Sequence, residues 1–167
     1  MPFTQWKLNI KNIVNFLLMH NIQFMYWWRK AKKGSLLAKY KVFRYSRKYG
    51  LEISLSSDID IGLYLGHPYN ITIGGNVKIG KNVNIHKGVT IGATNRGKSK
   101  GSPIIGNNVF IGINSTVVGG INIGNDVLIA PNSYVNFDVP SHSIVIGNPG
   151  KIHSKENATK LYVGYTV

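Results

Sequence analysis

Isoleucine and valine recur every six residues along most of this chain, and that period limits what it can fold into. The anchors form two runs in phase, first Ile73, Ile79, Ile85 and Ile91, then Ile105, Ile111, Val117, Ile123, Ile129 and Val135. Ile53, Ile59 and Leu65 already keep the same step. Residues six apart drift around an α-helix and cannot form one apolar stripe on it. The repeat therefore excludes a helix over this region.

A six-residue repeat is typical of parallel β-helices, in which stacked coils of short strands bury a ladder of aliphatic side chains. Gly, Asn and Asp beside the anchors, as in GKNV, GNNV and GNDV, suit the tight corners between strands. We therefore predict a mainly β fold, a left-handed parallel β-helix over residues 51–153. Residues 154–167 are expected to form a C-terminal tail.

The first fifty residues have a different period. Apolar residues recur there at steps of three and four, which predicts two or three helices in a short α-helical segment, residues 1–50. These residues are Leu8, Ile13, Phe16, Leu17, Phe24, Trp27, Trp28, Leu36, Leu37, Tyr40 and Phe43. Gly34 and Ser35 mark a break with Ser35 as the cap of the next helix, and Gly50 marks a stop.

Positive charge is concentrated in the same segment. The formal net charge is +14, the first fifty residues hold eleven of the twenty Lys and Arg, and the first acidic residue is Glu52. Such a segment is drawn to phosphates of a membrane surface, a lipid-linked sugar or a nucleic acid, although a solvated helix face explains it equally well. Nucleic acid is the weakest partner, because the repeat carries no stacking aromatic platform. We expect peripheral contact between residues 1–50 and an anionic membrane.

Composition also bears on compartment and metals. The chain has no cysteine, and its most apolar stretch, Ile13 to Trp28, is interrupted by polar residues. We therefore expect a cytoplasmic protein, at most peripheral to the inner face of the membrane. No histidine has a neighbour at metal-ligand spacing, so no metal site is predicted.

The repeat is interrupted twice, and repeat proteins often carry function at such places. The step from Leu65 to Ile73 is eight residues and contains Gly66-His67-Pro68. The step from Ile91 to Ile105 is fourteen residues and contains a polar, basic, glycine-rich stretch, which predicts a projecting loop over 94–103.

Four segments carry a resemblance to a known family. They are GLYLGHP (62–68), VKIGKNVNIHKGVTIG (77–92), the end of the loop at Gly101-Ser102-Pro103, and IGNPGKI (146–152). Over residues 50–153 the chain resembles the hexapeptide-repeat acyltransferases, in the serine acetyltransferase-like branch that also contains capsule and lipopolysaccharide O-acetyltransferases.

The resemblance implies an acetyl-CoA-dependent acyltransferase in which His67 is the general base. In serine acetyltransferases a carboxylate fifteen residues upstream orients this histidine, and Glu52 has that spacing here. A neutral imidazole with a hydrogen-bonded carboxylate suits proton abstraction from a hydroxyl. His86 is the main rival to His67, or a second group in the same site. Without cysteine for a thiol relay, direct transfer is expected.

The same resemblance places acetyl-CoA in a groove between adjacent subunits of a homotrimer. The donor-binding residues that it implies are Gly92, Ala93, Gly112, Ser115, Ala130, Gly147, Asn148, Pro149 and Lys151. Flat aliphatic faces on so short a prism also favour trimer formation. The Gly147–Gly150 stretch is equally explained as a turn that ends the β-helix.

Departures from the serine enzymes affect the expected acceptor. Gly66 stands where those enzymes have an Asp that helps hold the amino acid, and Ser102 stands where they have a second His. We therefore expect a sugar hydroxyl of a surface polysaccharide or its precursor, with free serine as the alternative. A non-catalytic β-helix that serves as a structural or binding module is the third reading. The acceptor-binding residues that we expect are Asn84, Asn95, Arg96 and Ser102.

Overall fold

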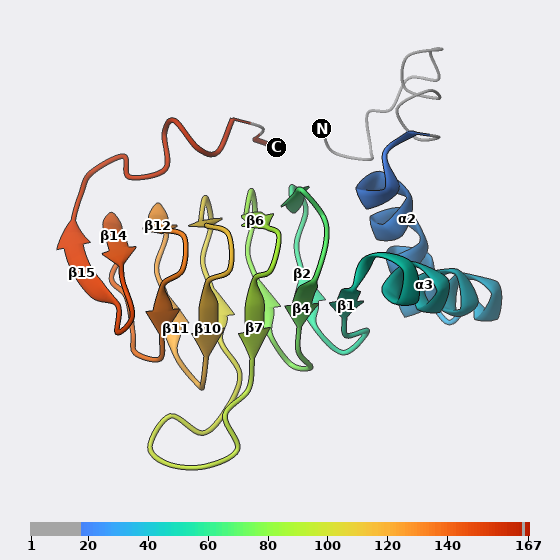
Figure 1. The fold of residues 1–167 in the computed structure, drawn as a ribbon, viewed down its shortest axis with the longest axis horizontal. Helices are drawn as coiled ribbons and strands as arrows, with labels where there is room; N and C mark the ends of the chain where they lie inside the picture. Colours follow the sequence, from blue (N-terminus) through green and yellow to red (C-terminus); the bar gives the residue numbers. More distant parts are fainter. Residues whose placement is uncertain (1–17, 165) are drawn as a thin grey trace.

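The computed structural model describes residues 18–164 and 166–167, and within them the chain forms a parallel β-helix of about five turns behind two helices (Figure 1). The predicted β-helical fold with a helical N-terminal segment is confirmed. Its strands form three sheets, which we call faces A, B and C, and the chain visits them in that order once per coil.

Face A is the five-stranded sheet, and its strands are β1 (Leu51–Ile53), β4 (Ile71–Ile73), β7 (Thr90–Gly92), β10 (Thr116–Val118) and β13 (Tyr134–Val135). Face B contains β2 (Asp58–Ile59), β5 (Lys78–Ile79), β8 (Ile104–Ile105) and β11 (Asn122–Ile123). Face C contains β3 (Tyr64–Gly66), β6 (Asn84–His86), β9 (Phe110–Ile111), β12 (Val127–Ile129), β14 (Ser143–Ile146) and β15 (Lys151–Ser154). Neighbouring strands are parallel in all three, except that β15 pairs antiparallel with β14.

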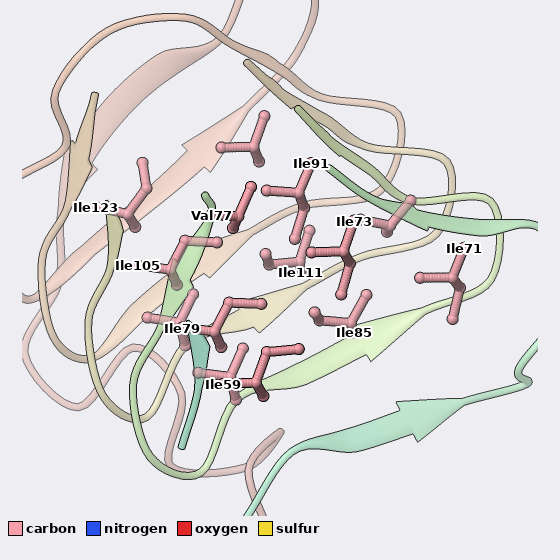
Figure 2. Packing of buried hydrophobic residues seen from close by; sticks show 14 of the residues in the cluster. Ile59, Ile71, Ile73, Val77, Ile79, Ile85, Ile91, Ile105, Ile111 and Ile123 are labelled. Carbon is pink, nitrogen blue, oxygen red and sulfur yellow. The ribbon is translucent and has the colours of Figure 1, made fainter. Parts of the chain in front are cut away.

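The hexapeptide anchors are the interior of the β-helix. Ile73 pairs with Ile91, Ile79 with Ile105 and Ile85 with Ile111, so each anchor stacks on the equivalent residue of the next coil. Figure 2 shows these side chains converging on the axis from all three faces. Because strand side chains alternate, burying the anchors turns their neighbours outward, where function can use them.

The two interruptions lie at two different corners of the coil. A regular coil takes 18 residues, as from Ile73 to Ile91, whereas the first coil takes 20, from Ile53 to Ile73. Its extra residues are in the corner between β3 and β4, which contains His67. The next coil takes 26, from Ile79 to Ile105, because it includes the loop 94–103 between β7 and β8.

Two helices precede the β-helix among the described residues, α2 (His20–Lys32) and α3 (Leu36–Tyr49). The predicted break and stop are confirmed: the Ser35 hydroxyl accepts a hydrogen bond from Ala38 N, and Gly50 ends α3 in the left-handed conformation. The helical pattern at Leu8 to Leu17 lies outside the described residues.

Helix α2 closes the open end of the first coil. The buried indole of Trp28 donates to Ile53 O over 3.1 Å, Asn21 Nδ2 donates to Leu65 O, and the Arg29 guanidinium donates to Ile59 O. These side chains donate hydrogen bonds to backbone carbonyls of all three strands of the first coil. Without α2, the carbonyls would be free to pair with a strand of another chain. In residues 18–164, no helix has the length and apolar character needed to cross a membrane.

The ladder predicts how the core responds to truncation. We expect Ile91→Ala, which empties a fully buried site in β7, to lower the free energy of unfolding by about 2–5 kcal/mol. The matched control is Ile104→Ala in β8, where 46% of the residue is exposed and the cost should stay within about 0.5 kcal/mol. Chemical denaturation of both variants measures the difference, and equal losses would contradict this assignment of the core.

Candidate active site

His67 lies at the corner between faces C and A, which we call the C–A edge. It follows β3 directly, its imidazole is exposed, and its φ of 49° is in the left-handed region where most other corner residues of this chain are Asn. Residues other than glycine adopt this conformation uncommonly, Asn, Asp and His more often than the rest, and His142 shares it with a φ of 57°. Uncommon backbone conformations concentrate at functional sites. The longer first corner thus presents an imidazole to solvent where most other corners present an amide.

Helix α2 braces this corner from behind. His20 Nε2 lies 3.2 Å from Pro68 O, and the His20 ring stacks on Tyr49 at 4.1 Å between centroids and meets the edge of Tyr69 at 5.2 Å. Sequence analysis did not single out His20, and this contact was not predicted. Its neighbours in space are 29 to 49 residues away in sequence, so no local signal points to the role.

His86 is the nearest titratable neighbour of His67, with ring centroids 6.1 Å apart. It pairs with Gly66, and its ring lies over that glycine, because a Cβ at Gly66 would come within 2.8 Å of ring atoms. Burial lowers the pKa of His86, and the charge of His67 lowers it further. The pair therefore combines an exposed imidazole with a half-buried one that favours the neutral form.

Glu52, the predicted partner of His67, lies in the middle of β1 on face A. Its side chain is exposed and lines a shallow hollow beside α3 with Phe43 and Thr72. Among the described residues no hydrogen bond or ion pair joins Glu52 to His67. The orienting role of Glu52 therefore stays a prediction.

Most of the expected donor-binding residues share the C–A edge with His67. Gly112 and Ala130 continue the outward column of face C above Gly66 and His86, and the turn 147–150 follows β14 at the same edge, before Lys151 begins β15. Four coil steps separate His67 from this turn, a rise of roughly 19 Å at the usual strand spacing. Gly147, Asn148, Pro149 and Lys151 thus lie at the far end of a column that begins at His67.

Ser115 does not face this column. It has no exposed surface, and its hydroxyl donates to Ala130 O over 2.9 Å, which supports the corner from inside. This side chain offers a bound molecule no surface in the single chain.

The other expected residues lie at the opposite end of face A, on what we call the A–B edge. Gly92 ends β7, Ala93 follows it, and the loop with Asn95 and Arg96 projects from this corner (Figure 1). The Ser102 hydroxyl donates to Gly75 O over 2.9 Å and so helps hold the loop base. The width of face A separates this group from His67, so one chain does not bring the two together.

Sequence reasoning missed that the C-terminal tail runs back along face C toward the histidines (Figure 1). Ala158 and Val163 pack on Phe110 and Leu128, which point outward from β9 and β12. The Tyr162 ring lies 4.9 Å from Phe110, which in turn lies 4.8 Å from His86. The sequence does contain a signal for this packing. The outward positions of β9, β12 and β14 hold the apolar residues Phe110, Leu128 and Ile144, which would otherwise be exposed to solvent.

The tail also occupies Asn84, an expected acceptor-binding residue. Asn84 is buried in β6, and its amide nitrogen donates to Tyr162 O over 2.8 Å. Its Oδ1 has no hydrogen-bond partner within the described part of the chain. In this structure Asn84 holds the tail beside His86.

Asp126 anchors the start of the tail. It accepts from Ala158 N, Thr159 N and the Thr159 hydroxyl, and lies 2.9 Å from His142 Nδ1. Partial burial acts to raise the pKa of Asp126, but these hydrogen bonds outweigh it and hold the pKa below its ordinary value. The hydrogen bond to Asp126 raises the pKa of His142, and Glu156 adds to the effect.

Comparison with known proteins identifies chains of similar sequence. The family described as "Bacterial transferase hexapeptide (six repeats)" matches residues 102–136. Serine acetyltransferase 2 of Arabidopsis thaliana is 38% identical over 125 residues, which are 75% of this chain and 38% of the relative. Serine acetyltransferase of Helicobacter pylori is 37% identical over 107 residues, 64% of this chain and 63% of the relative.

Solved structures of serine acetyltransferases are similar to this chain in fold. The structure of Neisseria gonorrhoeae serine acetyltransferase in complex with serine is similar with a TM-score of 0.75 and 28% identity, over 91% of this chain and 64% of that one. The soybean apoenzyme gives a TM-score of 0.74 at 28% identity, over 83% and 60%.

Fold and repeat together define a hexapeptide-repeat β-helix protein. The chain is similar to the hexapeptide-repeat acyltransferases, and its relatives reported above are serine acetyltransferases. It spans between 38% and 63% of the length of the two curated relatives.

The Asp126 anchor makes the tail sensitive to substitution. Asp126→Asn keeps a residue suited to the left-handed φ of 53°. It removes the negative charge of the carboxylate that accepts hydrogen bonds from Ala158 N and Thr159 N. We expect amide hydrogen exchange at these two residues to become at least about tenfold faster. Asp138→Asn, which alters a similar acceptor bonded to Asn122 N outside the tail, is the control and should leave tail exchange unchanged.

The anchor should also depend on pH in a defined direction. Because the pKa of His142 is raised above 6.5, its contribution is fully present below that value and is lost as pH rises through the folded-state pKa. The pKa of Asp126 is lowered below 3.8, so its contribution is lost only as pH falls through that lower value. Tail protection should be greatest in mild acid, and the same profile in Asp126→Asn would contradict this account.

Proposed function

We propose that this protein is an acetyl-CoA-dependent O-acetyltransferase in which His67 is the general base. The observation that carries the proposal is the placement of an exposed imidazole, at a lengthened left-handed corner, at the start of the column that ends in the 147–150 turn. The relatives' shared name, serine acetyltransferase, supports the same reaction class.

The chemistry needs few groups. His67 takes the proton of the acceptor hydroxyl as its oxygen attacks the thioester carbonyl of acetyl-CoA. The C–S bond then breaks, the acetyl group stays on the acceptor oxygen, and the leaving thiolate receives the proton from His67. His86, held toward its neutral form, can accept a hydrogen bond from the acceptor without adding a second positive charge.

The outward column on face C supports the assignment of the donor track. Gly112 and Ala130 project little, so an extended pantetheine arm can lie against the backbone between the turn and His86. Lys151, exposed at the turn, can face phosphate at the nucleotide end. Glu52 remains the proposed orienting carboxylate for His67.

We further propose a homotrimer, because one chain does not complete the site. The A–B edge carries the loop, with Asn95, Arg96 and Ser102, and the C–A edge carries His67. A threefold arrangement in which the A–B edge of one subunit meets the C–A edge of the next joins the two groups and forms three equivalent sites.

Among hydroxyl acceptors, serine has the stronger support, because the relatives described above all carry that name. A sugar hydroxyl, which the sequence departures favoured, has no support among them. One observation keeps it as the second candidate: the His86 ring fills the space over Gly66, so a carboxylate at position 66 would have to displace it. Recognition of the amino group of serine must then use another residue.

The proposed base is tested by His67→Ala. We expect kcat for thiol release from acetyl-CoA to fall by about a hundredfold or more, because the hydroxyl loses its proton acceptor. The control is His153→Ala, which removes an exposed histidine of β15 and should keep the wild-type rate. Light scattering should give both variants three times the chain mass of 18.5 kDa. A wild-type rate in His67→Ala would refute the proposed base.

The acceptor is tested by comparing thiol release from acetyl-CoA with serine and with a panel of free and lipid-linked sugars. We expect serine to give the higher kcat/KM. A sugar that exceeded serine would restore the second candidate. If no hydroxyl compound accelerated thiol release over water, the non-catalytic alternative would replace both.

A further inference from the structure

Helix α3 exposes an apolar and aromatic surface that the β-helix does not use. Leu36 is 79% exposed, Leu37 60%, Tyr40 54% and Phe43 57%. Leu36, Tyr40, Phe43 and Arg47 follow one another at steps of four, three and four, so they share one side of the helix. The opposite side, with Ala38 buried and Val42 and Tyr45 packed on the core, holds α3 to the molecule.

Cations lie within and around this surface. The Arg47 guanidinium lies 5.9 Å from the centre of the Phe43 ring, and Arg44 Nη1 donates to the Tyr40 hydroxyl over 3.5 Å. Lys33, Lys39, Arg44, Arg47 and Lys48 are all exposed on or beside the same helix. We call Leu36, Leu37, Tyr40, Phe43, Arg44 and Arg47 the α3 surface.

No Asp or Glu precedes Glu52 in the chain, and Glu52, which lines the hollow beside Phe43, is one carboxylate against the five exposed cations on or beside α3. Two copies of the α3 surface would bring like charges together, which disfavours self-association through it. A polyanion such as a nucleic acid would use the cations but gain nothing from Leu36 and Leu37. An anionic lipid surface uses both, since acyl chains accept the apolar side chains and headgroups accept Arg and Lys.

We propose that the α3 surface docks this protein onto an anionic lipid bilayer, with α3 lying flat in the headgroup region. The helix is 14 residues long, about 21 Å, and its outer side carries apolar and aromatic residues followed by Arg44 and Arg47, a combination found in interfacial helices. Figure 1 shows α3 at the end of the molecule beyond β1, well away from β14 and β15. The proposal is independent of the acceptor and of the proposed reaction.

The experiment is sedimentation of the full-length protein with vesicles of phosphatidylcholine mixed with phosphatidylglycerol. We expect binding to these vesicles, little binding to pure phosphatidylcholine, and weakening as salt rises. Arg44→Gln with Arg47→Gln should weaken binding by about tenfold to thirtyfold. Leu36→Ser with Leu37→Ser should weaken it by at least about tenfold, because the serines remove apolar side chains from the acyl region.

Matched controls separate this surface from general positive charge. Lys155→Gln with Lys160→Gln removes two exposed cations from the tail and should keep binding within about twofold of wild type. Circular dichroism should show that all variants fold. No binding of the wild-type protein at low salt would overturn the proposal, and so would equal losses in the arginine and tail-lysine variants.

Two further outcomes would also overturn it. Full binding by the leucine variant would show that the cations attract polyanions in general. A drop in oligomeric mass of the leucine variant without vesicles would identify the surface as a contact between copies of this chain.

Discussion

The stacking of aliphatic side chains inside the coil is the interaction on which the rest of the structure depends. Each anchor fills the space above the equivalent anchor of the previous coil, as Ile91 does above Ile73, so coils can be added only in register. Extra residues cannot enter a strand without turning its anchors outward, and they are confined to corners. This constraint explains why His67 and the loop 94–103 both lie at corners, where they add chemistry without disturbing the core.

The same constraint explains what the sequence could and could not predict. The strands, the Ser35 cap, the Gly50 stop and the corner of His67 follow from residues within one repeat or one helix turn. The brace from His20 to Pro68 and the tail contact from Tyr162 to Asn84 span 48 and 78 residues. Such contacts leave no periodic signal, because only one partner belongs to the repeat. The outward positions of Phe110 and Leu128 indicate that another segment covers face C. They do not indicate which segment this is.

The sorting of predicted site residues onto two edges was also beyond sequence analysis. Gly92, Arg96 and His67 lie within thirty residues of one another along the chain. In a triangular coil, however, position along the chain determines the corner, and these corners lie at opposite ends of face A. Either the loop contributes nothing to catalysis, or catalysis requires a second subunit. The exposed imidazole of His67 at an open edge agrees with the second possibility, because a base needs walls that exclude water and the single chain provides only one.

The N-terminal helices divide two tasks between them. Helix α2 is committed to the β-helix, since Trp28, Asn21 and Arg29 satisfy carbonyls of the first coil and His20 supports the corner of His67. Helix α3 packs on the core with only one side. The leucines and aromatic rings on its outer side therefore add nothing to the stability of the core. An exposed Leu or Phe beside arginines raises the risk of aggregation, and a chain that retains several of them along one helix face has a use for that face. Whatever surface α3 contacts is therefore brought within one helix diameter of α2, the element that supports the corner of His67.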